Sequence, residues 1–158
     1  MAGATRPGSR EAESDGARQV FVGTFEHSLD DKGRVVLPST FRSHLADKGF
    51  ISQLDDCLGL WTEDGFTEVA TLLTQKVRDG LAPQDAIRAF SSAAAEVRPD
   101  TQGRVTIPQR LRTAAGLVGE VVVIGRIERI EIWDASRWQE ISATADQSLT
   151  EVVRALGL

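Results

Sequence analysis

Residues 31–42 read Asp-Lys-Gly-Arg-Val-Val-Leu-Pro-Ser-Thr-Phe-Arg, and residues 101–112 read Thr-Gln-Gly-Arg-Val-Thr-Ile-Pro-Gln-Arg-Leu-Arg. An aspartate, Asp30 in one stretch and Asp100 in the other, stands immediately before each of them. The two stretches share their turn, their arginines and their proline. Because polar and apolar positions are both preserved, the repetition predicts that one supersecondary unit is used twice in this chain.

A second echo follows downstream of each stretch. Leu-Gly-Leu-Trp at residues 58–61 corresponds to Ile-Glu-Ile-Trp at residues 130–133, and a further aromatic residue, Phe66 or Trp138, follows each tryptophan. Base stacking is one conceivable use of the tryptophans. Their equivalent positions at the ends of strands favour packing in the core instead, where large aromatic side chains contribute most.

Each copy of the repeat predicts a tight turn, a short strand and a helix. An aspartate that can accept bonds from nearby backbone amides and a glycine that tolerates positive φ are typical of the turn. The strand ends at a proline, which cannot donate to a central ladder but suits the first turn of a helix. Apolar residues four apart then share one helical face. These segments are the turns 30–33 and 100–103, the strands 34–37 and 104–107, and the helical pairs Phe41/Leu45 and Leu111/Ala115, with Gly49 and Gly116 as helix ends.

The rest of the chain divides by composition and periodicity. The β-branched and aromatic run at residues 20–25 predicts a strand, and alternation on both sides of residues 125–128 predicts two more. Helical spacing of apolar residues, interrupted by Pro83, predicts a helical connector between the copies. We therefore expect an α+β fold, mainly β, with a disordered tail at 1–18, a first repeat at 24–66, a connector at 67–93, a second repeat at 94–137 and a C-terminal helix at 138–158.

Composition excludes several classes of protein. The chain has 158 residues, of which 41% are hydrophobic and 26% charged, as in an ordinary globular domain. No run of about 18 apolar residues predicts a membrane span, and no secretory signal is evident, so the cytoplasm is the expected location. A single cysteine, Cys57, excludes an internal disulfide and a cysteine cluster for zinc. We expect no cofactor and no metal site.

Charge is unevenly distributed along the chain. The net charge is −5, which argues against a generally basic nucleic-acid binder. Residues 96–112 nevertheless hold four arginines against two acidic residues, whereas residues 128–158 hold three arginines against six. Arginine directly after a turn can donate bidentately to a phosphate or to guanine. The alternative is that Asp30–Arg34 and Asp100–Arg104 are local ion pairs that stabilise their turns.

The motif Asp-x-x-Gly-Arg-Val-x-(Leu/Ile)-Pro-x-x-(Phe/Leu)-Arg resembles the signature of AbrB/SpoVT swapped-hairpin DNA-binding domains. Two copies in one chain resemble the MraZ family, over about residues 20–142. The resemblance implies tandem swapped-hairpin repeats of double-psi barrel type that interleave as a pseudo-dimer within one chain. It also implies that subunits assemble into ring-like homo-oligomers.

The resemblance further implies a cytoplasmic, nucleoid-associated transcriptional regulator. Such proteins bind repeated boxes in double-stranded promoter DNA upstream of the cell-division and cell-wall gene cluster that includes their own gene, usually as repressors. The motif carries over two DNA-contacting pairs, Asp30 with Arg34 and Asp100 with Arg104. Local charge adds five candidates that the motif does not specify, namely Lys32, Arg42, Arg98, Arg110 and Arg112.

Two rival functions are an enzyme and a protein-interaction module. His27 and His44 belong to no recognisable catalytic or metal-binding motif, and no phosphate-cradling glycine loop is present, so each histidine is expected at a turn or a helix surface. We therefore expect no enzymatic activity. In the second rival the arginine-bearing turns would bind an acidic partner protein instead of DNA, and selective retention on one promoter fragment would distinguish the two.

Overall fold

Both copies of the repeated unit form the same structure in this computed structural model, which describes residues 20–158. The predicted strands and helices follow the two turns, and Phe41, Leu45 and Leu111 are buried as expected. The elements in chain order are β1 (Thr24–Ser28), β2 (Arg34–Val36), α2 (Ser39–Leu45), β3 (Gly49–Gln53), β4 (Leu58–Thr62), α3 (Glu63–Arg78), α4 (Gln84–Ala93), β5 (Ala95–Val97), β6 (Arg104–Thr106), α5 (Gln109–Ala115), β7 (Glu120–Gly125), β8 (Ile130–Asp134) and α6 (Ala135–Leu156).

The main sheet interleaves strands from the two repeats. Its order is β1-β7-β8-β4-β3-β5, and every neighbouring pair is antiparallel. β1 precedes the first turn but pairs with β7 of the second repeat, whereas β5 precedes the second turn but pairs with β3 of the first repeat. Each repeat therefore lends its first strand to the hairpin of the other, so neither copy has a complete sheet of its own.

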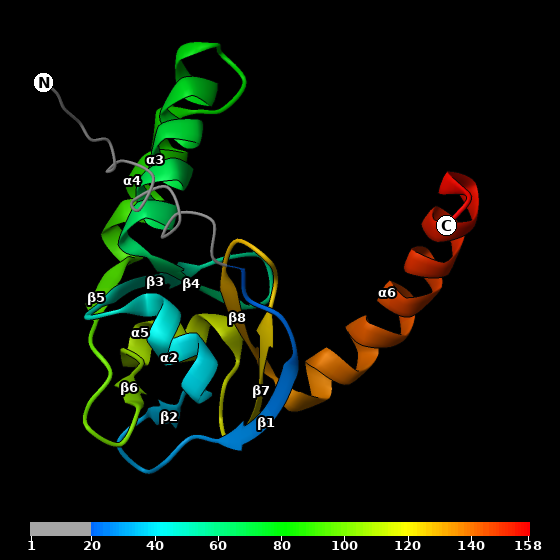
Figure 1. Ribbon diagram of the computed structural model, residues 1–158. Helices are drawn as coiled ribbons and strands as arrows, with labels where there is room; N and C mark the ends of the chain where they lie inside the picture. Colours follow the sequence, from blue (N-terminus) through cyan, green and yellow to red (C-terminus); the bar gives the residue numbers. More distant parts are fainter. Residues whose placement is uncertain (1–19) are drawn as a thin grey trace, which may run out of the picture.

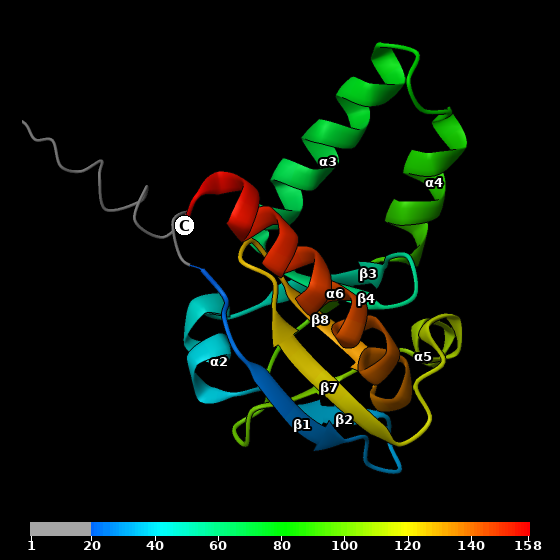
Figure 2. The ribbon, with the colours of Figure 1, turned by 90° about the vertical axis from the view of Figure 1, so that its right-hand side faces the viewer.

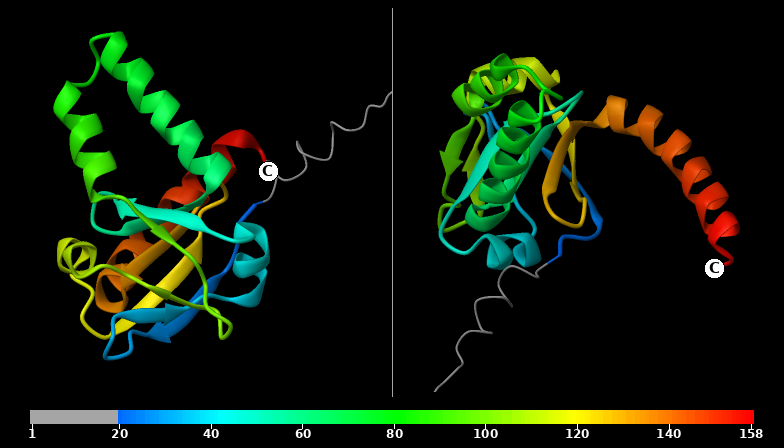
Figure 3. Two further views of the ribbon diagram at one scale, coloured as in Figure 1. Left: turned by 90° about the vertical axis from the view of Figure 1, so that its left-hand side faces the viewer. Right: turned by 90° about the horizontal axis from the view of Figure 1, so that it is seen from above.

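A separate two-stranded ribbon also combines the two repeats, because β2 of the first repeat pairs with β6 of the second. Val35 lies opposite Val105, and these two residues occupy equivalent positions in the two copies. The ribbon, α2 and α5 lie on one face of the main sheet, as Figures 1 and 3 show. Between them lies the main core, which contains Leu37, Ile107 and Leu111 without measurable exposure to solvent.

The other face of the sheet holds a smaller core under the beginning of α6. Val122 and Ile124 point to this face, while Val121 and Val123 point to the main core, as the two-residue period of a strand requires. Trp133 lies here and packs against Trp138 of α6 with ring centroids 5.6 Å apart. The core placement predicted for the strand-end tryptophans is confirmed, because Trp61 and Trp133 are both buried.

Two helical features project from this body. α3 and α4 are anchored by stacked rings, since Phe66 lies 4.9 Å from Phe50 and 5.4 Å from Phe90 between ring centroids. The two helices approach each other towards the loop that joins them, at the end away from the sheet (Figure 2). α6 leaves the sheet after its first turns and projects separately (Figure 1). No helix within residues 20–158 combines the length and apolar composition needed to cross a membrane.

Two expected boundaries were wrong. The first strand begins at Thr24 instead of residue 20, because Gly23 takes a φ of 108° and the preceding chain forms only an isolated bridge, Phe21 to Ile127. The first helix ends at Ala46, and Gly49 is instead the first residue of β3. The second helix does end at Gly116, in a left-handed conformation. The disordered tail expected at 1–18 lies outside the described residues.

Candidate nucleic-acid interface

The first turn, residues 30–33, is organised by the carboxylate of Asp30. One of its oxygens accepts hydrogen bonds from the backbone N–H groups of Lys32 at 3.0 Å and Arg34 at 2.8 Å. The other oxygen accepts from Nε of Arg34 at 2.7 Å. The main chain closes the turn, because the N–H of Gly33 donates to the carbonyl of Asp30 at 3.0 Å. One carboxylate thus fixes both the turn and the arginine that follows it.

The second turn, residues 100–103, repeats this geometry. Asp100 accepts from the backbone N–H groups of Gln102 and Arg104 at 2.9 Å each, and from Nε of Arg104 at 2.7 Å. The hydrogen bond from the Arg104 backbone lowers the pKa of Asp100 to about 2, and its Arg34 counterpart likewise lowers the pKa of Asp30. Both carboxylates therefore remain ionised well below neutral pH. The local ion pairs considered from the sequence are present in both repeats.

These ion pairs leave part of each guanidinium available. The aspartate engages Nε, the side edge of the group, in both repeats. Among residues 20–158, no acceptor is paired with the terminal Nη atoms of Arg34 or Arg104. Because two Nη groups form a planar fork, each arginine can still donate bidentately to an anion while its aspartate holds it in position.

Both arginines lie on the outward face of the β2–β6 ribbon. Val35 and Val105 point into the main core, whereas Arg34, Val36, Arg104 and Thr106 alternate with them and point away from it. Since Arg34 pairs with Thr106 and Val36 with Arg104, the two arginines are diagonal neighbours across the ribbon. Such positions are roughly 7–8 Å apart. The two turns lie at opposite ends of the ribbon, on the side of the molecule away from the α3–α4 projection (Figures 1 and 2).

The five candidates suggested by charge alone lie in different surroundings. Lys32 is exposed at the first turn. Arg42 and Arg112 are half-buried beneath the turns, where each donates to a backbone carbonyl. Arg110 donates to the carbonyl of Ser92 near the end of α4, at 3.0 Å. Arg98 pairs with Glu96 at 2.8 Å. Of the five, only Lys32 is therefore an exposed cation of a turn, beside the partly exposed Arg34 and Arg104.

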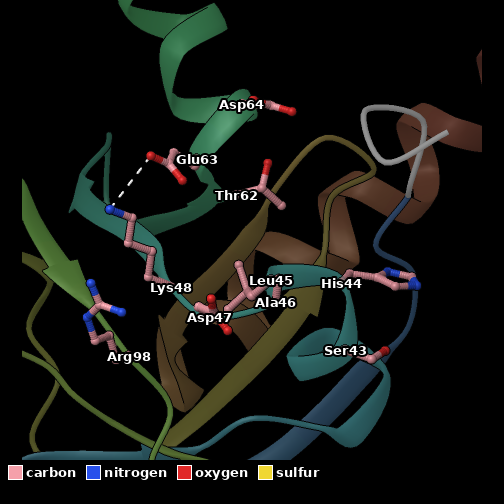
Figure 4. Close-up of a pocket in the computed structure, with 10 residues that line it drawn as sticks. All are labelled: Ser43, His44, Leu45, Ala46, Asp47, Lys48, Thr62, Glu63, Asp64 and Arg98. Carbon is pink, nitrogen blue, oxygen red and sulfur yellow. Dashed lines mark ion pairs between the residues drawn. The ribbon is translucent and has the colours of Figure 1, made fainter. Parts of the chain in front are cut away.

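The structure also contains an open polar pocket of about 450 Å³ between α2 and the start of α3. Its lysine and arginine are already paired. Lys48 lies 3.6 Å from Glu63 (Figure 4) and 3.7 Å from Glu96, and Arg98 lies 2.8 Å from Glu96. His44 lines the pocket, but its ring packs against Phe21 at a centroid distance of 5.5 Å. No three His, Cys, Asp or Glu side chains of the described part of the chain are grouped to hold a metal ion. This pocket offers no arrangement typical of catalysis.

Comparison with known proteins places the chain in a family. The family described as "MraZ protein, putative antitoxin-like" matches residues 20–77 and 90–156, which include both turns. The chain belongs to the MraZ family. A protein named "Transcriptional regulator MraZ" from Acetivibrio thermocellus is 35% identical over 140 residues, covering 88% of this chain and 98% of the relative.

Two further relatives with the same name agree. The MraZ of Frankia alni is 40% identical over 134 residues, covering 84% of this chain and 94% of its own. That of Kocuria rhizophila is 38% identical over 133 residues, covering 84% of this chain and 93% of its own. The family is one of transcriptional regulators and not of enzymes.

Sequence reasoning overlooked two residues of the outward ribbon face. Val36 is 38% exposed despite its apolar side chain, and Thr106 is exposed at the equivalent place in the second repeat. The signal that identifies them is the two-residue alternation around the buried Val35 and Val105. That alternation becomes informative once Arg34 and Arg104 are known to share a face, because it then places Val36 and Thr106 beside them.

Proposed function

We propose that this MraZ-family chain is a sequence-specific DNA-binding transcriptional regulator whose β2–β6 ribbon contacts double-stranded promoter DNA. The observation that carries the proposal is the duplicated pair of aspartate-held arginines on one outward face. The names of the relatives support the regulatory role. Lys32 adds a third cation on the same side. Asp30 and Asp100 orient the arginines in this proposal.

The chemistry of the ribbon suits DNA better than a small anion. The two forks start from residue positions about 7–8 Å apart, and each is held by the aspartate of its own turn at an opposite end of the ribbon. They can therefore reach different phosphates or base edges, whereas one small ligand would engage only one of them. A two-stranded ribbon is also a known means of entering a groove. Val36 and Thr106, between the arginines, would then face base edges. Arg98 and Arg110, whose side chains are held by other partners, would contribute to the surrounding field instead of direct contacts.

Few cations per chain imply that one chain alone binds DNA weakly. Each phosphate contact contributes a salt slope of about −0.9, so two or three contacts per chain release few counterions. Several chains on repeated boxes gain avidity without new contacts. We therefore include in the proposal a ring-like homo-oligomer that binds repeated promoter boxes.

Finer parts of the proposal follow from the family resemblance. They are a swapped-hairpin pseudo-dimer of AbrB/SpoVT type, a cytoplasmic, nucleoid-associated location, and repression of the cell-division and cell-wall cluster that includes the chain's own gene. The exchange of first strands between the repeats supports the first of these. Arg42 and Arg112, expected from charge to touch DNA, are better suited by their half-buried positions to a supporting role.

Fluorescence anisotropy tests the proposal on a labelled fragment from upstream of the protein's own gene, with scrambled competitor at two salt concentrations. The informative variant is Arg34→Ala/Arg104→Ala. Its matched control is Arg88→Ala/Arg126→Ala, which removes two arginines from exposed ion pairs with Asp85 and Glu128. We expect specific, salt-sensitive binding in the wild type and in the control, and its loss in the ribbon variant.

Other outcomes have definite meanings. If the ribbon variant keeps its oligomeric state and binds as well as the wild type, the turn arginines only stabilise their turns and the proposed contact surface is wrong. If the wild type does not prefer the promoter fragment, the rival function is favoured, in which the same arginines bind an acidic partner protein.

A further inference from the structure

The two DNA-facing turns rest on groups from the opposite repeat. Gly33 and Gly103 are buried although each belongs to a tight surface turn. Both have positive φ, 76° and 81°, which already favours glycine. Space is a second constraint, because a Cβ at either glycine would overlap an arginine side chain. A buried glycine at a surface turn therefore marks a close approach by another part of the chain.

In each repeat, the group that approaches the glycine comes from the opposite repeat. The guanidinium beneath Gly33 of the first repeat belongs to Arg112 of the second. The guanidinium beneath Gly103 of the second repeat belongs to Arg42 of the first. Each arginine comes from the helix that follows the ribbon strand of its own repeat, α5 or α2. The antiparallel β2–β6 ribbon brings the end of one strand beside the turn that starts the other, so the crossing follows from its register.

Hydrogen bonds fix each guanidinium in this place. Nη1 of Arg112 donates to the carbonyl of Ile107 at 2.6 Å, and the N–H of Ile107 donates to the carbonyl of Gly33 at 2.9 Å. In the other half, Nη1 of Arg42 donates to the carbonyl of Leu37 at 3.0 Å. The N–H of Leu37 then donates to the carbonyl of Gly103 at 2.9 Å. The two halves are equivalent bond for bond.

We propose that Arg42 and Arg112 are crossed positioning residues, each of which sets the conformation of the DNA-facing turn of the other repeat. The inference rests on the proposed function and deepens it. Arg112 supports the turn that aims Arg34, and Arg42 supports the turn that aims Arg104. A planar guanidinium can lie flat against a glycine turn while it donates to a carbonyl, which a lysine ammonium cannot reproduce. Substitution of either arginine should therefore disturb the turn of the other repeat.

Hydrogen exchange on the full chain tests the crossed support without DNA. In Arg112→Ala, the amides of the first turn should exchange about tenfold faster than in the wild type, while those of the second turn keep their wild-type rates. Arg42→Ala should give the reverse pattern. If both turns change equally in either variant, or if neither changes, the crossed support is wrong.

A double-mutant cycle tests the consequence for DNA binding. We expect Arg112→Ala to weaken binding of the promoter fragment about tenfold in the wild-type background and in Arg104→Ala, but less than about twofold in Arg34→Ala. The reason is that the turn it supports has already lost its contact in Arg34→Ala. A general loss of stability would weaken binding equally in both backgrounds, and that outcome would overturn the inference. Arg88→Ala, in an exposed pair on α4, is the matched control.

A second variant keeps the test decisive if Arg112→Ala does not fold. Arg112→Lys retains the aliphatic stem and the charge but loses the fork, so the same dependence on background is expected with a smaller effect. The failure of this inference and the failure of the proposed function are distinguishable. If the wild type shows no promoter preference, the proposed function is wrong, and the exchange pattern alone then decides whether the crossed support exists.

Discussion

Val35 and Val105, which occupy equivalent positions in the two repeats, lie directly opposite each other across the β2–β6 ribbon. The same relationship holds in the main sheet, where Gly59 of β4 lies opposite its equivalent, Glu131 of β8. Antiparallel pairing of equivalent residues is the arrangement that a twofold axis produces. An approximate twofold axis therefore passes through both pairs, and it places the two turns, with their arginines, symmetrically on one side of the molecule.

The symmetry predicts equal stability losses at its centre. Val35 is 1% exposed and Val105 0%, so truncation of either to alanine should lower the free energy of unfolding by about 1–3 kcal/mol. Val36→Ala is the matched control, because Val36 is next to Val35 in the strand but its side chain points outward. This substitution should lower the free energy of unfolding by less than about 0.5 kcal/mol. Urea unfolding at one protein concentration measures all three. A tolerated substitution at only one of the two buried positions would contradict the symmetry.

Gly33 should be far less tolerant of a side chain than Gly80. Both take nearly the same φ, 76° and 75°, so Gly80→Ala reports the backbone strain alone, which is about 1–2 kcal/mol. A Cβ at Gly80 would meet no heavy atom within 4 Å, whereas one at Gly33 would displace the guanidinium of Arg112. Thermal or urea unfolding of the two variants should therefore differ by at least about 1 kcal/mol. Equal losses would mean that the guanidinium moves away without cost.

Local features of the fold could be predicted from the sequence because they depend on neighbouring residues. Local chemistry predicts the turns at Asp30 and Asp100, the strands after them and the helices after the prolines. Because the pattern occurs in both copies, each of these elements was predicted independently in each repeat. The first strand was misplaced because Gly23, at a φ of 108°, interrupts a run that composition alone treats as continuous. Gly49 was misread as a helix end because its role is tertiary, with the Trp61 carbonyl closely approaching it.

The candidate site was only partly predictable for the same reason. Asp–Arg pairs four residues apart can be recognised locally, and both are present. The contacts of Arg42 and Arg112 depend on the pairing of β2 with β6, which joins residues 70 positions apart at Val35 and Val105. Charge density along the sequence could not distinguish a cation beneath a turn from one exposed at its surface.

Acid should weaken the contribution of Asp100 to stability over a defined range. Its pKa falls from 3.8 to about 2 in the folded chain, chiefly because the Arg104 backbone N–H bonds the ionised form. As pH falls, the unfolded chain therefore takes up this proton first, so the contribution is complete above about pH 4 and is lost towards pH 2. The stability difference between wild type and Asp100→Asn should close over that range. A carboxyl carbon of Asp100 that titrates near pH 4 by NMR would contradict this.

Cys57 should react slowly with alkylating reagents. Burial raises its pKa from 9.0 to about 12, and the nearby charge of Glu131 acts in the same direction. At pH 8 the reactive thiolate is thus roughly a thousandfold scarcer than in an ordinary cysteine. Iodoacetamide should modify the native protein slowly and the protein in denaturant rapidly, as mass spectrometry over time can follow. Similar rates in the two states would show that the smaller core opens readily.

A substitution on the outward ribbon face should change which bases the protein prefers without changing its contacts to phosphates. Val36 and Thr106 are equivalent by repeat but differ in chemistry, so under the proposed function the two halves of the face present different groups to the bases. Thr106→Val makes the halves alike and removes one hydroxyl without changing charge. It should alter the preference among fragments with single base changes, by about 1–3 kcal/mol at one position, and leave the salt slope unchanged.

Lys32→Ala is the complementary variant to Thr106→Val, because it removes a charge from a turn and leaves the ribbon face unchanged. It should reduce the magnitude of the salt slope by about 0.9 per chain and weaken all fragments alike. Competition binding at two salt concentrations measures both variants in one series. If Thr106→Val changes the slope, or if Lys32→Ala changes the base preference, the ribbon face does not lie against base edges and the proposed orientation on DNA is wrong.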